Sequence, residues 1–216
     1  MKLLEWIDIN KLNWQELSKN ENAIELLKAN PDKINWLKLS LNPNAIDLIR
    51  EELLKGGEKI NWNALSTNIN GVELLRDNID KLEDWENVSI NLNAIELLRE
   101  NPDKIEWDIL NLNKNAIELL KENPDKIDWD FLSSNPGAIE LLKENKDKIN
   151  WGSLSNNTAA IELLKEKIND DNNNDDNNID WIILSSNKNA IELLRENQDK
   201  INWTALSKNS GIFTNE

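Results

Sequence analysis

The sequence predicts an all-α fold, an α-solenoid of stacked short helix-turn-helix repeats. Tryptophan recurs along the chain, and five of the eight gaps between successive copies are 22 residues. An asparagine follows each of these tryptophans, and the apolar residues behind it have the spacing of one helical face. A unit this short cannot bury its own apolar side chains, so it must stack on its neighbours. The repeat tryptophans are Trp14, Trp36, Trp62, Trp85, Trp107, Trp129, Trp151, Trp181 and Trp203.

The first helix of each repeat, helix A, is predicted to begin at the tryptophan. The residue before most of the tryptophans is Asn or Asp, whose side chain accepts hydrogen bonds from the free amides of a first helical turn. A leucine follows three residues later, as in Trp129 and Leu132, which places both on one helical face; a strand would place them on opposite faces. The predicted N-caps are Asn13, Asn35, Asn61, Asp84, Asp128, Asn150, Asp180 and Asn202.

The second helix, helix B, is predicted to start at the asparagine that occurs in all nine repeats. Asn is a preferred N-cap, and in two repeats Pro43 or Pro136 follows it, as is typical of a first helical residue. These asparagines are Asn20, Asn42, Asn68, Asn91, Asn113, Asn135, Asn157, Asn187 and Asn209. We expect helix B to end at a second set of asparagines. Asn tolerates the left-handed conformation that ends helices, and the proline that follows some of them cannot continue a helix. These are Asn30, Asn78, Asn101, Asn123, Asn145 and Asn197.

We expect one repeat domain over residues 1–216, with an N-terminal cap at 1–10, eight repeats at 11–199 and a partial ninth at 200–216. The apolar residues of the cap have the pattern of the end of a preceding helix B. A leucine-rich-repeat-like α/β solenoid, with a strand in place of helix A, stays open as an alternative because its repeats have similar lengths.

Three irregular gaps between tryptophans indicate insertions of four, one and eight residues. The four lie near Glu51–Lys55 and add about one turn to helix B, which we expect Gly56 to end. The single residue lies near Glu83, before helix A. The eight lie in 169–178, an Asn/Asp tract that we interpret as a low-complexity loop insertion.

The tryptophans suggest two interpretations, a stacking platform for bases or sugars and a set of core side chains. The formal net charge is -15, from 40 acidic and 25 basic residues. Nucleic-acid binding depends on neutralising phosphates, so this charge argues against a nucleic-acid partner. We therefore expect each indole ring to lie in the core of its repeat, with its N–H bonded to an acceptor such as a carbonyl.

Helix B carries a row of acidic and a row of basic side chains three residues apart, which places each pair on neighbouring surface positions of the helix. We interpret them as ladders of exposed ion pairs that keep this face solvated. The acidic row is Glu25, Asp47, Glu73, Glu96, Glu118, Glu140, Glu162 and Glu192. The basic row is Lys28, Arg50, Arg76, Arg99, Lys121, Lys143, Lys165 and Arg195.

The sequence predicts no enzyme, no cofactor and no metal site. It contains no His, Cys or Tyr and no Gly-rich phosphate loop, so no catalytic constellation is recognisable. Asp171, Asn173 and Asp175 have the spacing of the first ligands of an EF-hand loop. However, Asp176 stands where the loop needs Gly, and Ile182 stands where a bidentate Glu belongs.

The repeats differ most at the two residues that follow each tryptophan. Repeat scaffolds keep their frame constant and vary the residues that meet a partner, so we expect an apolar protein-binding stripe on helix A. The alternative is that these side chains are half-buried between neighbouring A helices. The candidate partner-binding residues are Leu37, Leu41, Ile109, Leu112, Phe131, Ile182 and Ile183.

The chain resembles the short Asn-Pro/Trp repeat proteins predicted in large DNA viruses of algae and protists. The residues that carry the resemblance are Ile127-Asp128-Trp129, Leu132-Ser133, Asn135-Pro136, 138–142 and 123–127. It covers nearly the whole chain and implies origin and repeat architecture, but no activity. Departures from the pattern are Gly71 for the usual Ala, Ala159 after Thr158, and the long insertion.

The function that we expect is a non-enzymatic scaffold that binds protein through an elongated surface. The alternative is a structural component or spacer of a virus particle. No run of 18 apolar residues is present, and the first residues lack a continuous apolar signal region, so we expect neither a membrane span nor secretion. An intracellular protein, cytoplasmic in a host cell if it is viral, is expected. The partner and the oligomeric state stay open.

Overall fold

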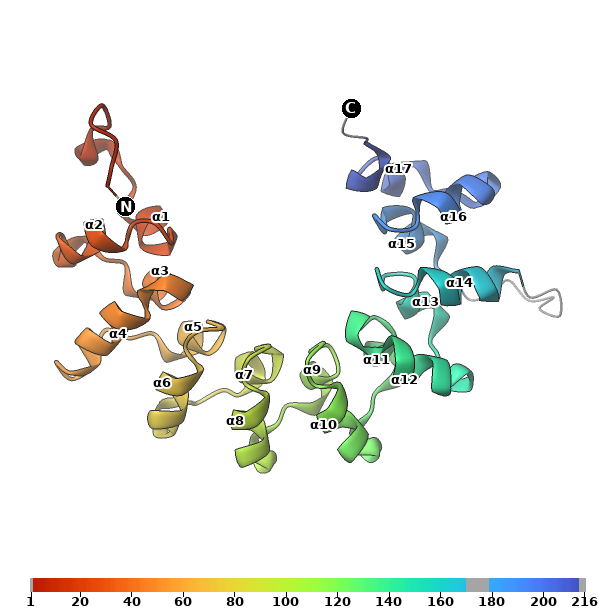
Figure 1. Cartoon of the computed structure of the whole chain (residues 1–216), viewed down its shortest axis with the longest axis horizontal. Coiled ribbons are helices and arrows are strands. Elements are labelled where there is room, and N and C mark those ends of the chain that lie inside the picture. The colour runs from red at the N-terminus through yellow and green to blue at the C-terminus, as the bar shows by residue number, and fades with distance from the viewer. Residues whose placement is uncertain (1, 170–178, 214–216) are drawn as a thin grey trace. The chain divides into compact units, whose positions relative to one another are not determined.

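The structure, a computed structural model, describes residues 2–169 and 179–213, and every regular element in them is an α-helix or a 3-10 turn (Figure 1). The all-α prediction is confirmed. The leucine-rich-repeat-like alternative is not supported, because it needs a strand at each tryptophan and no strand is present in these residues. The chain divides into two compact units, Met1–Glu106 and Trp107–Glu216, each of which is described by itself.

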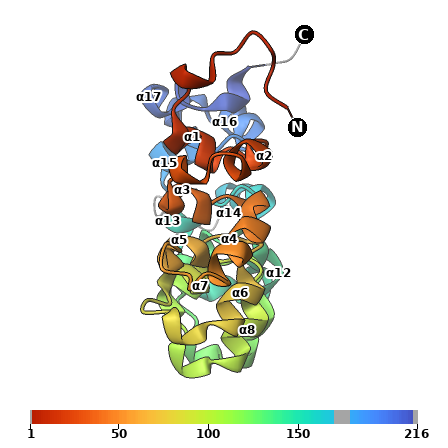
Figure 2. The same ribbon diagram turned by 90° about the vertical axis from the view of Figure 1, so that its left-hand side faces the viewer.

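In the first unit the A helices alternate with the B helices along the chain. The A helices are α1 (Trp14–Lys19), α3 (Trp36–Ser40), α5 (Trp62–Ser66) and α7 (Glu86–Ile90). The B helices are α2 (Ile24–Lys28), α4 (Ile46–Leu53), α6 (Val72–Asp77) and α8 (Ile95–Glu100). Helix α1 packs on α3, α3 on α5 and α5 on α7, so the A helices of this unit form one row and its B helices a second (Figure 2).

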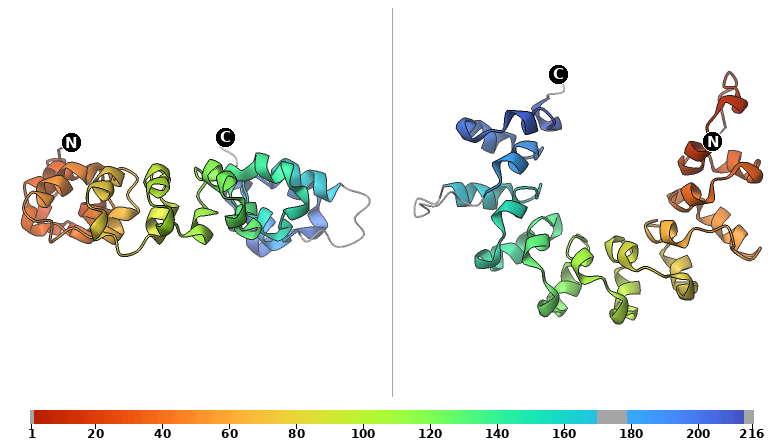
Figure 3. Two further views of the ribbon diagram at one scale, coloured as in Figure 1. Left: turned by 90° about the horizontal axis from the view of Figure 1, so that it is seen from below. Right: turned by 180° about the vertical axis from the view of Figure 1, so that it is seen from behind.

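The second unit repeats this arrangement. Its A helices are α9 (Trp107–Leu110), α11 (Trp129–Ser133), α13 (Trp151–Leu154), α15 (Trp181–Ser186) and α17 (Trp203–Leu206). Its B helices are α10 (Ile117–Glu122), α12 (Ile139–Glu144), α14 (Ile161–Ile168) and α16 (Ile191–Glu196). Helix α11 packs on α13 and α15 packs on α17, and the same two rows are seen from behind (Figure 3).

The centre of each repeat is made of leucine and alanine. The leucine three residues after the tryptophan is fully buried in Leu39, Leu65 and Leu132, and helix B adds buried leucines such as Leu120 and Leu142. A fully buried leucine contributes about 1.5–3 kcal/mol relative to an exposed one. The short helices therefore depend on contacts between repeats, because helices of one or two turns are marginal by themselves.

The prediction that the tryptophans form the core is confirmed for Trp85 alone, which is 7% exposed. Trp203 is 65% exposed, and the other seven repeat tryptophans are half-buried. The predicted hydrogen bond from the indole N–H to another described residue is absent in all nine. The physical reason is the position of the tryptophan in the sequence. It stands at the start of a very short helix, so its ring lies at the edge of the repeat. The leucine three residues later fills the centre of the repeat instead.

The helix A caps are confirmed. The side-chain oxygen of Asn35 accepts a hydrogen bond from the amide of Lys38 at 3.0 Å, and Asp180 accepts from Ile183 at 2.9 Å. Asp84 accepts from the amide of Glu86 at 2.9 Å, although α7 starts one residue later than predicted. The single inserted residue thus leaves the cap in place.

The predicted start of helix B needs a correction. The asparagine does cap a turn, since the side-chain oxygen of Asn42 accepts from the amide of Asn44 at 3.0 Å. However, that turn is the 3-10 segment Pro43–Ala45, and α4 begins only at Ile46. The proline after the asparagine therefore opens a 3-10 turn rather than an α-helix.

The predicted ends of helix B are confirmed in position but wrong in mechanism. Asn101 has φ -134° and Asn197 has φ -130°, which is not the left-handed region. Instead, the side-chain amide donates to the carbonyl four residues earlier, as from Asn101 to Leu97 at 2.9 Å. Left-handed backbone does occur after α4, at Gly56 and Gly57 with φ 115° and 71°. Helix α4 has 8 residues against 6 in α6 and in α8, so the insertion lengthens helix B by about half a turn, less than the full turn predicted.

Two further predictions concern the chain's irregular segments. Residues 2–8 form no helix, and Leu3, Leu4 and Trp6 are exposed, so the predicted end of a preceding helix B is wrong. The predicted low-complexity loop at 169–178 lies outside the described residues except for Asn169, which ends α14.

The asparagine shared by all repeats, termed the ladder asparagine, joins neighbouring repeats within each unit. Its amide nitrogen donates to two backbone carbonyls of the preceding repeat, as from Asn157 to Ser133 at 3.0 Å and to Asn135 at 2.9 Å. The same pair of bonds is made by Asn42, Asn68, Asn91, Asn187 and Asn209. These side chains are at most 5% exposed. The sequence analysis recognised only their capping role.

A second ladder consists of the residue four positions after each tryptophan, termed the ladder serine. Its hydroxyl donates to the tryptophan carbonyl and accepts the backbone N–H of the next repeat's N-cap, as at Ser133, which donates to Trp129 at 2.6 Å and accepts from Asn150 at 3.0 Å. Asn111 replaces serine in the fifth repeat and accepts from the amide of Asp128 at 3.1 Å. Both ladders join neighbouring repeats through backbone atoms.

We predict that Asn157→Asp lowers the free energy of unfolding by about 3 kcal/mol or more at neutral pH. The carboxylate keeps the turn cap on Ala159, but it loses both donors and faces two buried carbonyls, and an unsatisfied buried group or charge costs about 1–5 kcal/mol. The measurement is urea unfolding followed by tryptophan fluorescence.

The matched control is Asn156→Asp, one residue earlier. Asn156 is exposed and its side chain makes no hydrogen bond to another described residue, so the same substitution should change stability by less than about 0.5 kcal/mol. Equal losses in the two variants would show that the ladder asparagine contributes nothing specific.

Candidate interaction surface

The tryptophan edge of the repeats carries lysines from the following repeat. The ammonium nitrogen of Lys33 lies 4.7 Å from the ring centroid of Trp14, and that of Lys148 lies 4.9 Å from Trp129. Lys59 and Trp36 form a third such pair. Lys167 of α14, which belongs to the same repeat as Trp151, lies over the Trp151 ring at 5.2 Å. A cation over an aromatic face at an exposed site contributes about 0.5–1 kcal/mol.

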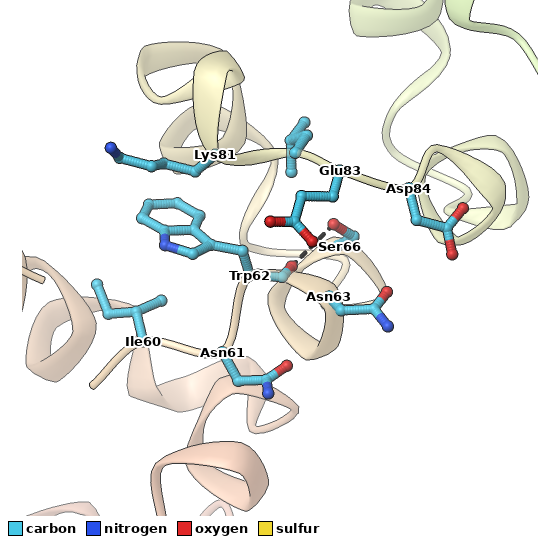
Figure 4. A pocket seen from close by; sticks show the side chains of 9 residues that line it. Ile60, Asn61, Trp62, Asn63, Ser66, Lys81, Glu83 and Asp84 are labelled. Carbon is cyan, nitrogen blue, oxygen red and sulfur yellow. Dashed lines mark hydrogen bonds between the residues drawn. The ribbon is translucent and has the colours of Figure 1, made fainter. Parts of the chain in front are cut away.

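Open clefts lie beside these rings. In the first unit a cleft of about 260 Å³ is lined by Trp62, Ser66, Lys81, Glu83 and Asp84 among others. Figure 4 shows Lys81 beside the Trp62 ring and Glu83 extending toward Ser66. The Ser66 hydroxyl donates to the Trp62 carbonyl at 2.9 Å but accepts no hydrogen bond from another described residue.

The cause of this cleft is the single inserted residue before Asp84. In the other described repeats the N-cap amide reaches the ladder serine, or Asn111, of the preceding repeat. The extra residue moves the Asp84 amide away from Ser66, so the second ladder is interrupted at this one junction.

In the second unit a wider cleft of about 550 Å³ is lined by Lys146, Asp147, Trp151, Glu166 and Lys167. The ammonium of Lys146 donates to the Glu166 carboxylate at 2.6 Å. This hydrogen bond, with the attraction of its charge, lowers the pKa of Glu166. Lys146 and Glu166 neutralise each other's charge. The Trp151 ring lines the same cleft beside this ion pair.

The charged rows of helix B form the predicted ion pairs in six repeats, with nitrogen–oxygen distances of 2.6–3.5 Å. A hydrogen bond to Glu118 raises the pKa of Lys121, and one to Glu140 raises that of Lys143. In the two other repeats, Asp47 and Arg50 form no ion pair with each other, and Lys165 pairs with Glu196 of the next repeat at 3.5 Å. The charges are exposed and paired, as predicted for a solvated face.

The candidate partner-binding residues separate into exposed and half-buried groups. Leu37 is 50% exposed, Leu112 37%, Phe131 43% and Ile182 60%. The half-buried residues are Leu41, Ile109 and Ile183. The exposed residues fit the predicted protein-binding stripe, and the half-buried residues fit the alternative that they lie between neighbouring A helices.

These residues do not form one continuous stripe within a unit. Leu37 and Leu41 belong to the first unit, and the other five belong to the second. In the second unit Ile109, Phe131 and Ile183 occupy the second position after the tryptophan, and Ser153 of α13 interrupts that row. Ile182 occupies the first position and lies on a different row.

Sequence reasoning missed the ladder asparagines, the ladder serines and the lysines over the indoles. One signal was present. The helix A caps alternate between Asn and Asp, because a cap needs only an acceptor, whereas the ladder position is Asn in all nine repeats. Asp never occurs at the ladder position. Asn differs from Asp in having an amide nitrogen that donates hydrogen bonds, so this pattern indicates that the nitrogen is needed as a donor.

Comparison with protein-family models, curated proteins and solved structures finds no match to this chain. Within residues 2–169 and 179–213, no three His, Cys, Asp or Glu side chains are grouped so that they could hold a metal ion. In the same residues no helix has both the length and the apolar character required to span a bilayer.

We predict that Lys146→Gln raises the pKa of Glu166 toward the ordinary glutamate value. A carboxyl with a lowered folded-state pKa stabilises the fold above its unfolded pKa, and this contribution is lost as the pH falls through the folded pKa. The variant should therefore lose that acid-sensitive contribution. Carbon-13 NMR titration of the glutamate carboxyls measures the change.

The matched control is Lys188→Gln, since Lys188 is exposed and forms no ion pair with a described residue. It should leave the Glu166 titration unmoved. A Glu166 titration that is the same in wild type and in Lys146→Gln would contradict the assigned cause.

Proposed function

We propose that this chain is a non-enzymatic α-solenoid scaffold that binds protein through the exposed side chains of its A helices. The observation that carries the proposal is that different residues of a repeat hold the frame and face the solvent on helix A. The ladder asparagine and ladder serine hold the frame through backbone carbonyls and amides, and neither depends on the residues that follow the tryptophan. Those residues vary without disturbing the frame.

The exposed apolar side chains on helix A support a protein partner. Leu37 on α3, Phe131 on α11 and Ile182 on α15 each leave between 43% and 60% of their surface in solvent. Large apolar side chains that are exposed on an otherwise charged surface often mark interaction sites. Aromatic side chains such as Phe131 are also enriched at protein interfaces.

The charge of the chain supports protein over nucleic acid as the partner class. The formal net charge is -15, and some lysines near the tryptophan edge are paired with carboxylates, as Lys81 is with Asp80 at 3.2 Å and Lys126 with Asp125 at 3.3 Å. A phosphate backbone would need unpaired cations at these places.

The solenoid architecture has a test that is independent of any partner. A compact globule of this length has a radius of gyration of about 17 Å, from the scaling of folded domains. We predict a larger value from small-angle X-ray scattering of the purified chain, because stacked repeats contact only their neighbours. A radius of gyration near about 17 Å would contradict the solenoid.

The binding surface is tested with a double variant, Phe131→Asp with Ile182→Asp. Both side chains are exposed, so the fold should survive while the apolar surface of α11 and α15 becomes acidic. We expect proteins captured from native cells by the wild-type chain to be lost from this variant by at least about tenfold, a difference of about 1.4 kcal/mol.

Leu54→Asp is the matched control, because Leu54 is 89% exposed and lies at the end of α4, away from helix A. It should retain the captured proteins. Retention by the double variant, with wild-type circular dichroism, would remove these A-helix residues as the binding surface.

A further inference from the structure

We propose that the cleft beside Trp62 binds the ammonium group of a lysine side chain that a partner protein presents. The inference rests on the proposed function, since it names what one site of a protein-binding scaffold recognises. Three groups in the cleft lining carry it: the Trp62 ring, the Ser66 hydroxyl and the Glu83 carboxylate. All three belong to the first unit.

Other junctions of the chain show what a repeat indole contacts. In three of them the lysine three residues before the next tryptophan lies over the ring. Its ammonium nitrogen is 4.7 Å from the ring centroid of Trp14, 5.7 Å from that of Trp36 and 4.9 Å from that of Trp129. A cation is attracted to the negative face of an aromatic ring. These lysines are Lys33, Lys59 and Lys148. The repeat frame therefore already contains a lysine-binding contact.

The single inserted residue removes this lysine from the Trp62 ring. Leu82 stands three residues before Trp85, where the three other junctions have lysine. Lys81 is displaced by one position, and its ammonium pairs with the Asp80 carboxylate at 3.2 Å. Among the described residues no cation lies over the Trp62 ring, which lines the open cleft. The aromatic face is therefore available to a cation from outside the chain.

The Ser66 hydroxyl is the second unused group. Ser66 is 1% exposed and lines the cleft, and its hydroxyl donates to the Trp62 carbonyl at 2.9 Å. At the other described junctions the corresponding oxygen accepts the N-cap amide of the next repeat, as Ser40 accepts from Asn61 at 3.3 Å. No described residue donates to the Ser66 oxygen. A buried acceptor of this kind needs a donor from water or from a ligand.

Glu83, at the insertion, supplies negative charge. Figure 4 shows its carboxylate extending toward Ser66 beside the Trp62 ring. It forms no ion pair with a described residue. Asp84 adds a second carboxylate to the cleft lining. The two carboxylates outnumber the single lysine of the lining, Lys81, so the cleft favours a cation.

The wider cleft in the second unit lacks this combination. Its Trp151 ring already has the Lys167 ammonium over it at 5.2 Å. Its Glu166 carboxylate accepts a hydrogen bond from Lys146 at 2.6 Å. Both contacts that an incoming lysine needs are thus made within the chain.

A lysine ammonium matches the groups around Trp62. It carries three N–H donors and a compact positive charge. One donor bonds to the Ser66 oxygen and another to the Glu83 carboxylate, while the charge faces the indole. The cleft volume of about 260 Å³ is below the range of about 300–1,000 Å³ typical of small-molecule sites, so it suits one side chain. The backbone N–H of Asp84, which has no described acceptor, offers a donor to a peptide carbonyl beside the lysine.

The test is an NMR titration of the nitrogen-15-labelled full chain with the capped tripeptide acetyl-Gly-Lys-Gly-amide. The indole N–H signal of Trp62, identified by its absence in Trp62→Phe, and the backbone amide signals of Leu82 and Asp84 should shift and saturate, with a millimolar dissociation constant. The same peptide with acetyl-lysine keeps the stem but lacks the charge, so it should cause no saturating shift. Free n-butylamine lacks the peptide carbonyls and should bind more weakly than the lysine peptide.

Glu83→Gln should weaken binding of the lysine peptide by about threefold or more, the size of one ion pair. Glu51→Gln is the matched control. Glu51 is exposed on α4, lies outside the cleft lining and forms no ion pair with a described residue. It changes the net charge by the same amount and should leave the dissociation constant unchanged.

Deletion of Glu83 tests the origin of the site. It places Lys81 three residues before Trp85, the position that Lys148 has before Trp151.

In this variant Lys81 should lie over the Trp62 ring, and the Asp84 amide should reach the Ser66 hydroxyl, so the chain fills its own cleft. We expect slower hydrogen exchange of the Asp84 amide than in the wild type, because that amide gains an acceptor. The lysine peptide should then cause no saturating shift, and circular dichroism checks that the fold is kept.

Four results would overturn the proposal. The wild type shows no saturating shift with the lysine peptide, or it binds the acetyl-lysine peptide or n-butylamine equally well. Glu83→Gln binds the lysine peptide as tightly as the wild type. The folded deletion variant still binds it. The scaffold function is tested separately, since Phe131 and Ile182 lie in the other unit, and failure of the lysine site leaves their capture experiment unaffected.

Discussion

The structure depends on a buried asparagine amide that bonds to the backbone of the preceding repeat. A ladder asparagine caps its own turn with the side-chain oxygen and, from the second repeat on, can join the preceding repeat with the nitrogen, as Asn42 does to Ser18 and Asn20. Burial of both polar ends is tolerated only because both are satisfied. Since the partners are backbone atoms, the bond sets the spacing between repeats whatever the other side chains are.

The tryptophans occupy a different place from the one that their regular spacing suggests. A large aromatic residue at a fixed interval is expected in a core, yet all of these rings except Trp85 are half-buried or exposed at the edge, and in three cases a lysine of the next repeat lies over the ring. Leucine and asparagine take the buried centre. The indoles therefore add contact area between neighbouring repeats without being sealed from solvent.

Insertions reveal how much change the frame tolerates. The insertion of four residues gives an α4 of 8 residues and leaves the ladder bonds from Asn68 to Ser40 and Asn42 intact. A single residue before Asp84 interrupts the serine ladder, but the bond from Asn91 to Ser66 persists at 2.8 Å. The asparagine ladder is thus the more robust of the two connections, because both of its ends lie within the compact turn after helix A.

The sequence by itself determined the helical class, the repeat boundaries and the caps of helix A, because apolar spacing and capping are local properties that nearby residues decide. It also determined the ion pairs within helix B, which lie three residues apart on one helix. Tertiary structure alone decided which side chains are buried, how Asn101 ends its helix, and that residues 2–8 form none. It also decided which atoms join the repeats: the amide of Asn157 meets carbonyls 22 and 24 residues away, and its bonds therefore exist only when two repeats are already stacked.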